Sequence, residues 1–172
     1  MNNKSDDNRF DAITDERNLE LLRRTFEIAE ESRADGNTPF GALLADAEGN
    51  ILLEQKNIEL TERDCTGHAE TSLARRASKQ YDKEFLWSCS LYTSCEPCCM
   101  CTGAIYWGNI GRIVFGLSEH MLFQTTGDNE INPSFNHSCR EILSTGQKDI
   151  VVEGPFEELR EEALKAHEGF WD

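Results

Sequence analysis

Apolar residues recur at helical spacing in the first part of the chain that has a regular pattern. Four of them lie three or four positions apart, so a helix would place all four on one face: Leu19, Leu22, Phe26 and Ala29. We predict an amphipathic helix over residues 17–34 that ends just before Gly36. The preceding residues 1–15 are polar and charged, and they predict a flexible arm.

Five short segments have the patterns of strands. Residues 41–45 and 51–55 are separated by Ala47-Glu48-Gly49-Asn50, a sequence that suits a tight hairpin turn. Residues 89–94 alternate between apolar and polar positions. Residues 112–117 are almost continuously apolar, the pattern of a strand buried on both faces. Residues 149–154 form the last strand pattern.

Helical patterns separate most of these strands. Residues 68–81 carry an apolar stripe, residues 97–108 open with proline and end with glycine, and residues 155–171 open with proline and early acidic residues. Residues 118–149 are irregular and predict no element. Strands that alternate with helices imply an α/β fold around a core sheet. Since no linker or repeat divides the chain, we expect a single domain over residues 1–172, but the pattern does not give the strand order.

The composition indicates a globular protein and gives an expectation for its location in the cell. Hydrophobic residues make up 38% of the 172 residues and aromatic residues 9%. No run of about 18 apolar residues occurs, which excludes a membrane-spanning helix. The first residues lack an apolar stretch flanked by basic residues, so no secretory signal is expected. A cytoplasmic location follows as an expectation.

The net charge of the chain indicates which class of partner it can bind. The 17 basic and 32 acidic residues give a net charge of −15. A surface of this sign repels phosphate backbones, so a nucleic-acid partner is disfavoured. A small molecule is the expected partner.

Cysteine supplies the main chemical signal. Seven cysteines are an odd number, and four of them fall within "SCEPCCMC" at 94–101. Clustered, reduced thiols indicate a metal or catalytic site rather than a disulfide framework. The cluster is compatible with a redox motif, half of a structural zinc site or a catalytic metal centre. A second C-x-x-C, which a structural zinc site would use, is absent from the rest of the chain.

Helix geometry separates the four thiols. In a helix that begins at Pro97, Cys98 and Cys101 project from the same face, while Cys99 is rotated by about 100° from Cys98. A further ligand is needed, and His68 lies in His68-Ala69-Glu70 at the start of another predicted helix. One histidine and two thiolates leave a fourth position open for water, as in a catalytic zinc site. Glu70 would then move protons beside that water.

This combination has the H-x-E…P-C-x-x-C signature of zinc nucleobase deaminases. "PFGALL" at 39–44, Asn57, "HAE" at 68–70 and "LYTSCEPCCMCTGAIYW" at 91–107 resemble the cytidine deaminase-like superfamily. Within it, they are most similar to bacterial guanine deaminases and tRNA adenosine deaminases. The resemblance covers residues 39–116. It implies a three-layer α/β/α sandwich with a mixed five-stranded sheet, one zinc ion (Zn2+) per subunit and a homodimer or larger assembly.

The resemblance also implies roles for individual residues. Asn57 would hydrogen-bond the base, and the backbone N–H groups of Ala69 and Cys98 would line its polar edge. Phe40 would stack on the ring, although a phenylalanine at the start of a strand is more often part of the core. The resemblance to guanine deaminases also implies an acidic residue that contacts the purine in the region of Asp128, Asn129 and Glu130, with Asp128 the candidate.

The remaining candidates have simpler alternative explanations. Cys95 and Cys99 are expected to be buried small residues rather than ligands. Phe170 and Trp171 follow an acidic helix and are candidates for a lid over the site, but docking on the domain is the more common outcome.

The sequence therefore predicts a zinc-dependent hydrolase that deaminates a base or nucleoside, with a guanine-type aminopurine preferred. A tRNA adenosine deaminase and a cytosine deaminase are alternatives within the same chemistry. A structural zinc or thiol-redox module is the non-enzymatic alternative. It requires that Glu70 be dispensable and that Cys95 matter as much as Cys98.

Overall fold

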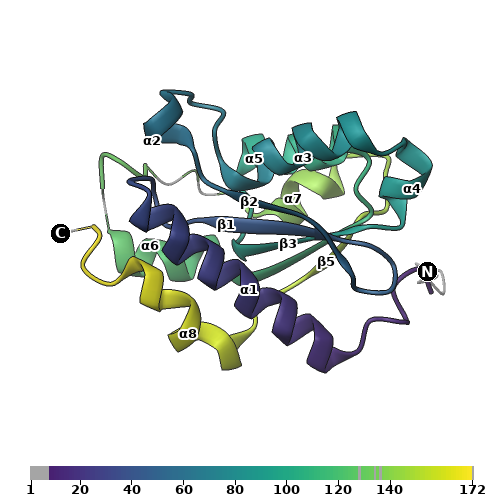
Figure 1. Ribbon diagram of the computed structural model, residues 1–172, viewed down its shortest axis with the longest axis horizontal. Coiled ribbons are helices and arrows are strands. Elements are labelled where there is room, and N and C mark those ends of the chain that lie inside the picture. The colour runs from purple at the N-terminus through teal and green to yellow at the C-terminus, as the bar shows by residue number, and fades with distance from the viewer. Residues whose placement is uncertain (1–7, 128, 134, 136, 172) are drawn as a thin grey trace.

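Five strands form one mixed sheet in the order β2-β1-β3-β4-β5 (Figure 1). The computed structural model describes residues 8–127, 129–133, 135 and 137–171. Strand β1 runs antiparallel to β2 and β3, whereas β3, β4 and β5 are parallel. The strands are β1 (Gly41–Ala45), β2 (Ile51–Lys56), β3 (Ser90–Cys95), β4 (Arg112–Leu117) and β5 (Val151–Glu153). The predicted mixed five-stranded sheet is confirmed.

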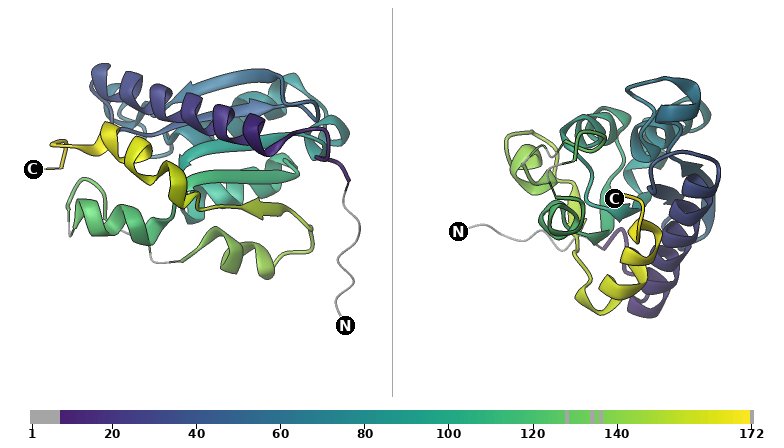
Figure 2. Two further views of the ribbon diagram at one scale, coloured as in Figure 1. Left: turned by 90° about the horizontal axis from the view of Figure 1, so that it is seen from below. Right: turned by 90° about the vertical axis from the view of Figure 1, so that its left-hand side faces the viewer.

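Helices cover both faces of this sheet (Figure 2). Helices α1 and α8 lie on one face, and α3, α5 and α7 lie on the other. The α-helices are α1 (Asp15–Ala34), α2 (Glu59–Glu62), α3 (Ala69–Gln80), α4 (Lys83–Trp87), α5 (Cys99–Gly108), α6 (Glu119–Thr126), α7 (Cys139–Ser144) and α8 (Arg160–Leu164). No helix in the described ranges is long and apolar enough to cross a membrane.

The period of two along the strands produces the three layers. On β1, Ala42 and Leu44 point into the core under α3 and α5, while Leu43 and Ala45 point into the core under α1. Every residue of β4 is buried, which confirms that this apolar run is a strand covered on both faces. The α/β/α sandwich therefore contains two apolar cores, one on each side of the sheet.

The structure corrects the prediction for the N-terminal arm. Phe10 and Ile13 are buried, and the Arg9 guanidinium donates a 2.8 Å hydrogen bond to the carbonyl oxygen of Trp87. The predicted arm over 1–15 is therefore wrong for residues 8–14. Burial of Phe10 and Ile13, together with the Arg9 hydrogen bond, holds this largely polar segment against the domain. Residues 1–7 lie outside the described part of the chain.

Other elements also differ from the prediction. Helix α5 begins at Cys99 rather than at Pro97, because Cys98 is extended and precedes the helix. The single C-terminal helix predicted over 155–171 is instead a 3-10 turn (Glu157–Leu159), helix α8 and a second 3-10 turn (Lys165–His167). The irregular segment 118–149 contains α6 and α7, each opened by a capping serine, Ser118 and Ser138.

Candidate active site

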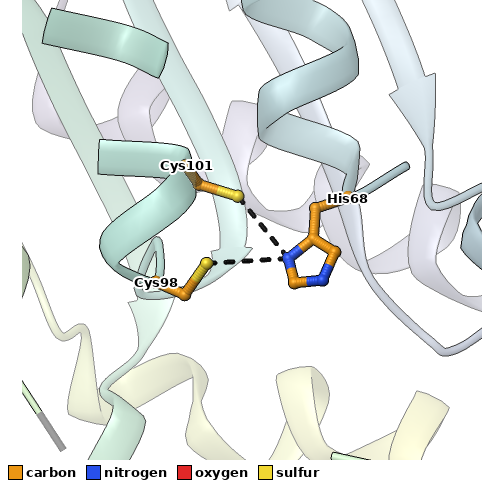
Figure 3. Close-up of side chains that lie close together, drawn as sticks. All are labelled: His68, Cys98 and Cys101. Carbon is orange, nitrogen blue, oxygen red and sulfur yellow. Dashed lines mark hydrogen bonds between the residues drawn. The ribbon is translucent and has the colours of Figure 1, made fainter. Parts of the chain in front are cut away.

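Three side chains converge where α3 and α5 begin (Figure 3). His68 immediately precedes α3, Cys98 immediately precedes α5, and Cys101 lies in the first turn of α5. The Nδ1 atom of His68 is 3.6 Å from the Sγ atom of Cys98 and 3.6 Å from the Sγ atom of Cys101. The structure thus brings together the three residues that were predicted from the sequence to be metal ligands.

The packing of the fold explains this convergence. Helices α3 and α5 pack against each other on one face of the sheet. The loop that carries Cys98 leaves the carboxyl end of β3, and the parallel strand β4 ends at the same edge. In open α/β sheets, this edge is where ligands bind. Two segments about 30 positions apart in the sequence therefore meet at one site.

The donor set fits a zinc ion. One imidazole nitrogen and two sulfur atoms lie within 4.8 Å of one another, and no second such group occurs among the residues that the structure describes. Zinc prefers nitrogen and sulfur ligands, and catalytic sites use three protein ligands with one open position. Cys95 and Cys99, which were predicted from the sequence not to be ligands, lie outside this group.

The three groups influence one another's protonation. Hydrogen bonds from Cys101 and from His68 lower the pKa of the Cys98 thiol to about 4. The hydrogen bond with Cys98 raises the pKa of His68 to about 9. The same neighbour, together with burial, raises the pKa of Cys101. The site therefore stabilises a thiolate at Cys98, which is the form of cysteine that binds metal.

Glu70 lies directly beside this group, one residue into α3. Its side chain is buried, and its Oε1 atom accepts a 2.7 Å hydrogen bond from the Thr93 hydroxyl. Its Oε2 atom accepts from the Cys101 thiol at 3.4 Å. Burial raises the pKa of the Glu70 carboxyl, opposed in part by the Thr93 hydrogen bond. A raised pKa favours the protonated form of a carboxyl, and a general acid–base group must both take up and release a proton.

These residues open into a hollow of about 380 Å³, including space open to solvent. A volume of this order suits a small molecule. Five residues predicted from the sequence as site residues line it: Phe40, Asn57, His68, Glu70 and Cys98. The sequence analysis missed five other lining residues: Cys95, Glu96, Glu119, Leu122 and Asn132.

Glu96 joins the metal loop to the helices that the sequence could not place. It is buried, and its Oε2 atom accepts a hydrogen bond from the backbone N–H of Glu119, the first residue of α6, at 3.1 Å. Its Oε1 atom accepts from the backbone N–H of Cys139, the first residue of α7, at 2.9 Å. A carboxylate at a helix N-terminus is favourable, and Glu96 serves two such ends. Its position beside Pro97-Cys98 was the feature of the sequence that could have indicated a role for Glu96 at the site. Leu122 and Asn132 had no such signal.

Three other residues were predicted from the sequence to belong to the site: Ala69, Asp128 and Trp171. The Ala69 side chain is buried in the core between α3 and the sheet, and the contact predicted for its backbone N–H stays a prediction. Asp128 lies outside the described residues. Trp171 stacks on His167, with ring centroids 5.9 Å apart, and lies 6.2 Å from the Phe40 ring. Trp171 is therefore docked on the domain beside the hollow, without lining it.

Lowering the pH is expected to destabilise the protein through His167. This side chain is 1% exposed, and burial lowers its pKa from 6.5 to about 4, with a smaller contribution from Arg33. The indole N–H of Trp171 donates to its Nδ1 atom at 3.2 Å, which requires a neutral ring. Because the pKa is lower in the folded state, the unfolded chain binds the proton first as the pH falls below 6.5. Stability is therefore lost between pH 6.5 and about 4, by about 3 kcal/mol in total.

Urea unfolding of the wild type and of His167→Gln at about pH 7 and about pH 5 tests this expectation. The free energy of unfolding of the wild type should fall by about 2 kcal/mol more than that of the variant over this interval. His120→Gln, on an exposed part of α6, serves as the control substitution. Equal losses in the wild type and His167→Gln would exclude His167 as the source.

Comparison with known proteins is consistent with the chemistry of this site. Residues 15–117 match the family model described as the cytidine and deoxycytidylate deaminase zinc-binding region. A probable cytosine deaminase of Schizosaccharomyces pombe is 37% identical over 157 residues, which cover 91% of this chain and 94% of the relative. The guanine deaminase of Bacillus subtilis is 43% identical over 101 residues, or 58% of this chain and 64% of the relative.

A solved structure extends the comparison to the fold. The guanine deaminase of Nitrosomonas europaea superimposes with a TM-score of 0.67 at 22% identity, covering 85% of this chain and 80% of that one. At this identity the likeness supports the fold alone, and it agrees with the three-layer sandwich. The family match spans α3, α5 and the residues just before them, and so includes His68, Glu70, Cys98 and Cys101. The chain therefore belongs to the cytidine and deoxycytidylate deaminase zinc-binding family.

Proposed function

We propose that the protein is a zinc-dependent hydrolase that removes an amino group from a free base or nucleoside and releases ammonia. One observation carries the proposal. The buried Glu70 carboxyl is held by Thr93 and lies 3.4 Å from the sulfur of Cys101, beside the candidate ligand group. A structural zinc site has no use for an acid–base group at this place, whereas hydrolytic deamination requires one.

In the proposed reaction, three residues bind the metal and one residue transfers protons. His68, Cys98 and Cys101 would hold the zinc ion, which would supply a Lewis acid that lowers the pKa of a water molecule. Glu70 accepts a proton from the attacking water and passes it to the ring nitrogen. Glu70 then takes the remaining proton from the hydroxyl group added to the ring carbon and delivers it to the departing amino group, so that water is consumed, ammonia leaves and a carbonyl group remains on the ring.

The lining of the hollow supports a flat, polar ring as substrate. Phe40 offers an aromatic face, and Asn57 offers an amide to the edge of the ring. Glu119 and Asn132 add acceptors for N–H donors. A guanine-type aminopurine presents several such donors, and it is the substrate that we assign first. Cytosine is the second candidate, because the relative that is matched along 94% of its length is named a probable cytosine deaminase.

Two further alternatives are less well supported by the residues present. A tRNA substrate would bring phosphates toward a chain of net charge −15, whose hollow is itself lined by Glu70, Glu96 and Glu119. A thiol-redox role would require a reactive thiolate at Cys95, yet burial raises the pKa of that thiol well above its usual range.

Zinc analysis and an ammonia-release assay test the proposal. The purified protein should contain about one zinc ion per chain and release ammonia from guanine faster than from guanosine, adenine, adenosine, cytosine or cytidine. Fastest release from cytosine would replace the first assignment by the second. A tRNA oligonucleotide in the same panel should remain intact and unbound at physiological salt. Absence of both zinc and ammonia release would refute the deaminase assignment.

A homodimer is part of the proposal. Trp107 on α5 is 76% exposed, and its neighbours on this helix, Gly103 and Ala104, are small and only partly buried. Added side-chain volume at Gly103 would meet no atom within 4 Å. Such an apolar helix face supports contact with the same face of a second copy. Sedimentation equilibrium should give twice the 19.5 kDa chain mass.

A further inference from the structure

We propose that Glu59 is a positioning residue for the zinc ligand His68. Its carboxylate faces the Nε2–H group of the imidazole, keeps Nδ1 directed at the two sulfur atoms and thereby tightens zinc binding. The inference rests on the zinc centre proposed above and concerns the affinity for the metal rather than the choice of substrate.

The two nitrogen atoms of His68 face different partners. Nδ1 lies 3.6 Å from both cysteine Sγ atoms. On the other side of the ring, Nε2 lies 3.7 Å from Oε2 of Glu59. Both side chains are about one-third exposed, at 34% for His68 and 30% for Glu59, so the pair is only partly screened by water. If Nδ1 binds the metal, the neutral ring carries its single proton on Nε2, the atom that faces Glu59.

The backbone around Glu59 is tightly constrained. The N–H of Glu59 donates to the Asn57 side-chain oxygen at 2.8 Å, and its carbonyl oxygen accepts from the N–H of Asp64 at 3.0 Å. The N–H of Ile58 donates to the carbonyl oxygen of Gly67 at 2.9 Å. A Cβ atom at Gly67 would lie 2.9 Å from the Cα atom of Glu59, so only glycine fits there without movement. The loop therefore folds back and presses Glu59 against the residue that precedes the ligand.

The neighbouring acidic residues do not occupy the same place. Asp64 binds Thr66 with its side chain and lies 3.8 Å from Arg75. Glu62, on the same short helix α2 as Glu59, is exposed. Glu59 is thus the acidic residue of this loop that contacts the imidazole.

The chemical consequence follows from the behaviour of metal-bound histidine. A carboxylate that accepts the second ring N–H fixes the tautomer and the orientation of the ring and makes the ligating nitrogen more basic. Loss of such a partner weakens metal binding by about 10–100-fold in other proteins. The same range is expected here.

Zinc affinity, measured by competition with a chelator at constant pH, tests the proposal. Glu59→Ala should bind zinc about 10–100-fold more weakly than the wild type. Glu59→Gln, which keeps an oxygen acceptor without the charge, should fall between them. Glu62→Ala is the matched control from the same helix and should bind like the wild type. Affinity of Glu59→Ala within about twofold of the wild type would overturn the proposal.

Two further measurements separate positioning from a general structural role. The metal-free forms of Glu59→Ala and the wild type should unfold at the same urea concentration. If metal-free Glu59→Ala unfolded at a lower urea concentration than the metal-free wild type, that result would count against the proposal. Nitrogen NMR of the zinc-loaded wild type should show the His68 proton on Nε2, and a proton on Nδ1 would also overturn it. Neither measurement depends on the substrate. A wild type that binds no zinc would instead refute the proposed function itself.

Discussion

Glu70→Gln is expected to abolish deamination while leaving the zinc content unchanged. The amide keeps the size of the side chain and can still accept from the Thr93 hydroxyl, but it cannot take up or release a proton in the catalytic range. Because Glu70 serves every proton transfer of the proposed reaction, turnover should fall by at least about 10²–10⁴-fold. Ammonia release under saturating substrate, measured beside zinc content, provides the test.

The control for this prediction is Glu84→Gln, which makes the same chemical change at an exposed position of α4. It should retain wild-type turnover and zinc. Full activity in Glu70→Gln would contradict the mechanism and favour a zinc site without hydrolytic chemistry. Loss of zinc in that variant would instead mean that Glu70 supports the ligand group, with which it shares the Cys101 hydrogen bond.

Cys101→Ser is expected to lose both zinc and activity. Cys101 is completely buried, and its sulfur lies 3.6 Å from the Nδ1 atom of His68. A serine hydroxyl is a poor zinc ligand, because proteins bind this metal through thiolate, imidazole or carboxylate. The zinc content should fall from about one per chain to a small fraction, and ammonia release should fall with it.

Cys99→Ser provides the matched control, because Cys99 lies two positions earlier in the same helix but outside the ligand group. This variant should keep its zinc and at least most of its activity. Circular dichroism of both variants shows whether the fold survives. Full zinc content in a folded Cys101→Ser would contradict the ligand assignment. If Cys99→Ser lost zinc to the same extent, the separation of the thiols by helix geometry would be wrong.

The local features of the chain were largely predictable from its sequence. Hydrophobic periodicity gave helix α1 and strand β4 almost to the residue, because each buries a continuous apolar face or run. The C-terminal element was predicted less well. Its acidic residues suit a helix, but the segment bends to bring His167 and Trp171 against Phe40, so contacts distant in sequence outweigh the local propensity.

The segment 118–149 shows the limit of pattern analysis most clearly. Helices α6 and α7 are eight and six residues long, too short to display a full apolar stripe. Their N-terminal N–H groups bind the buried carboxylate of Glu96, whose role is invisible until the loop before Cys98 is folded. Two of the lining residues of the hollow, Glu119 and Leu122, lie on α6 and depend on this arrangement.

By itself, the sequence determined the ligand types, their spacing and the acid–base residue, because His68, Glu70, Cys98 and Cys101 lie in two short motifs, each at the start of a helix. Only the tertiary structure decided which atoms meet. The packing of α3 on α5 turns Nδ1 of His68 toward both thiols and leaves Nε2 facing Glu59. It also decided which residues enclose the substrate space, since Glu96, Glu119 and Asn132 come from segments that approach one another only when the sheet and both of its helical layers have assembled.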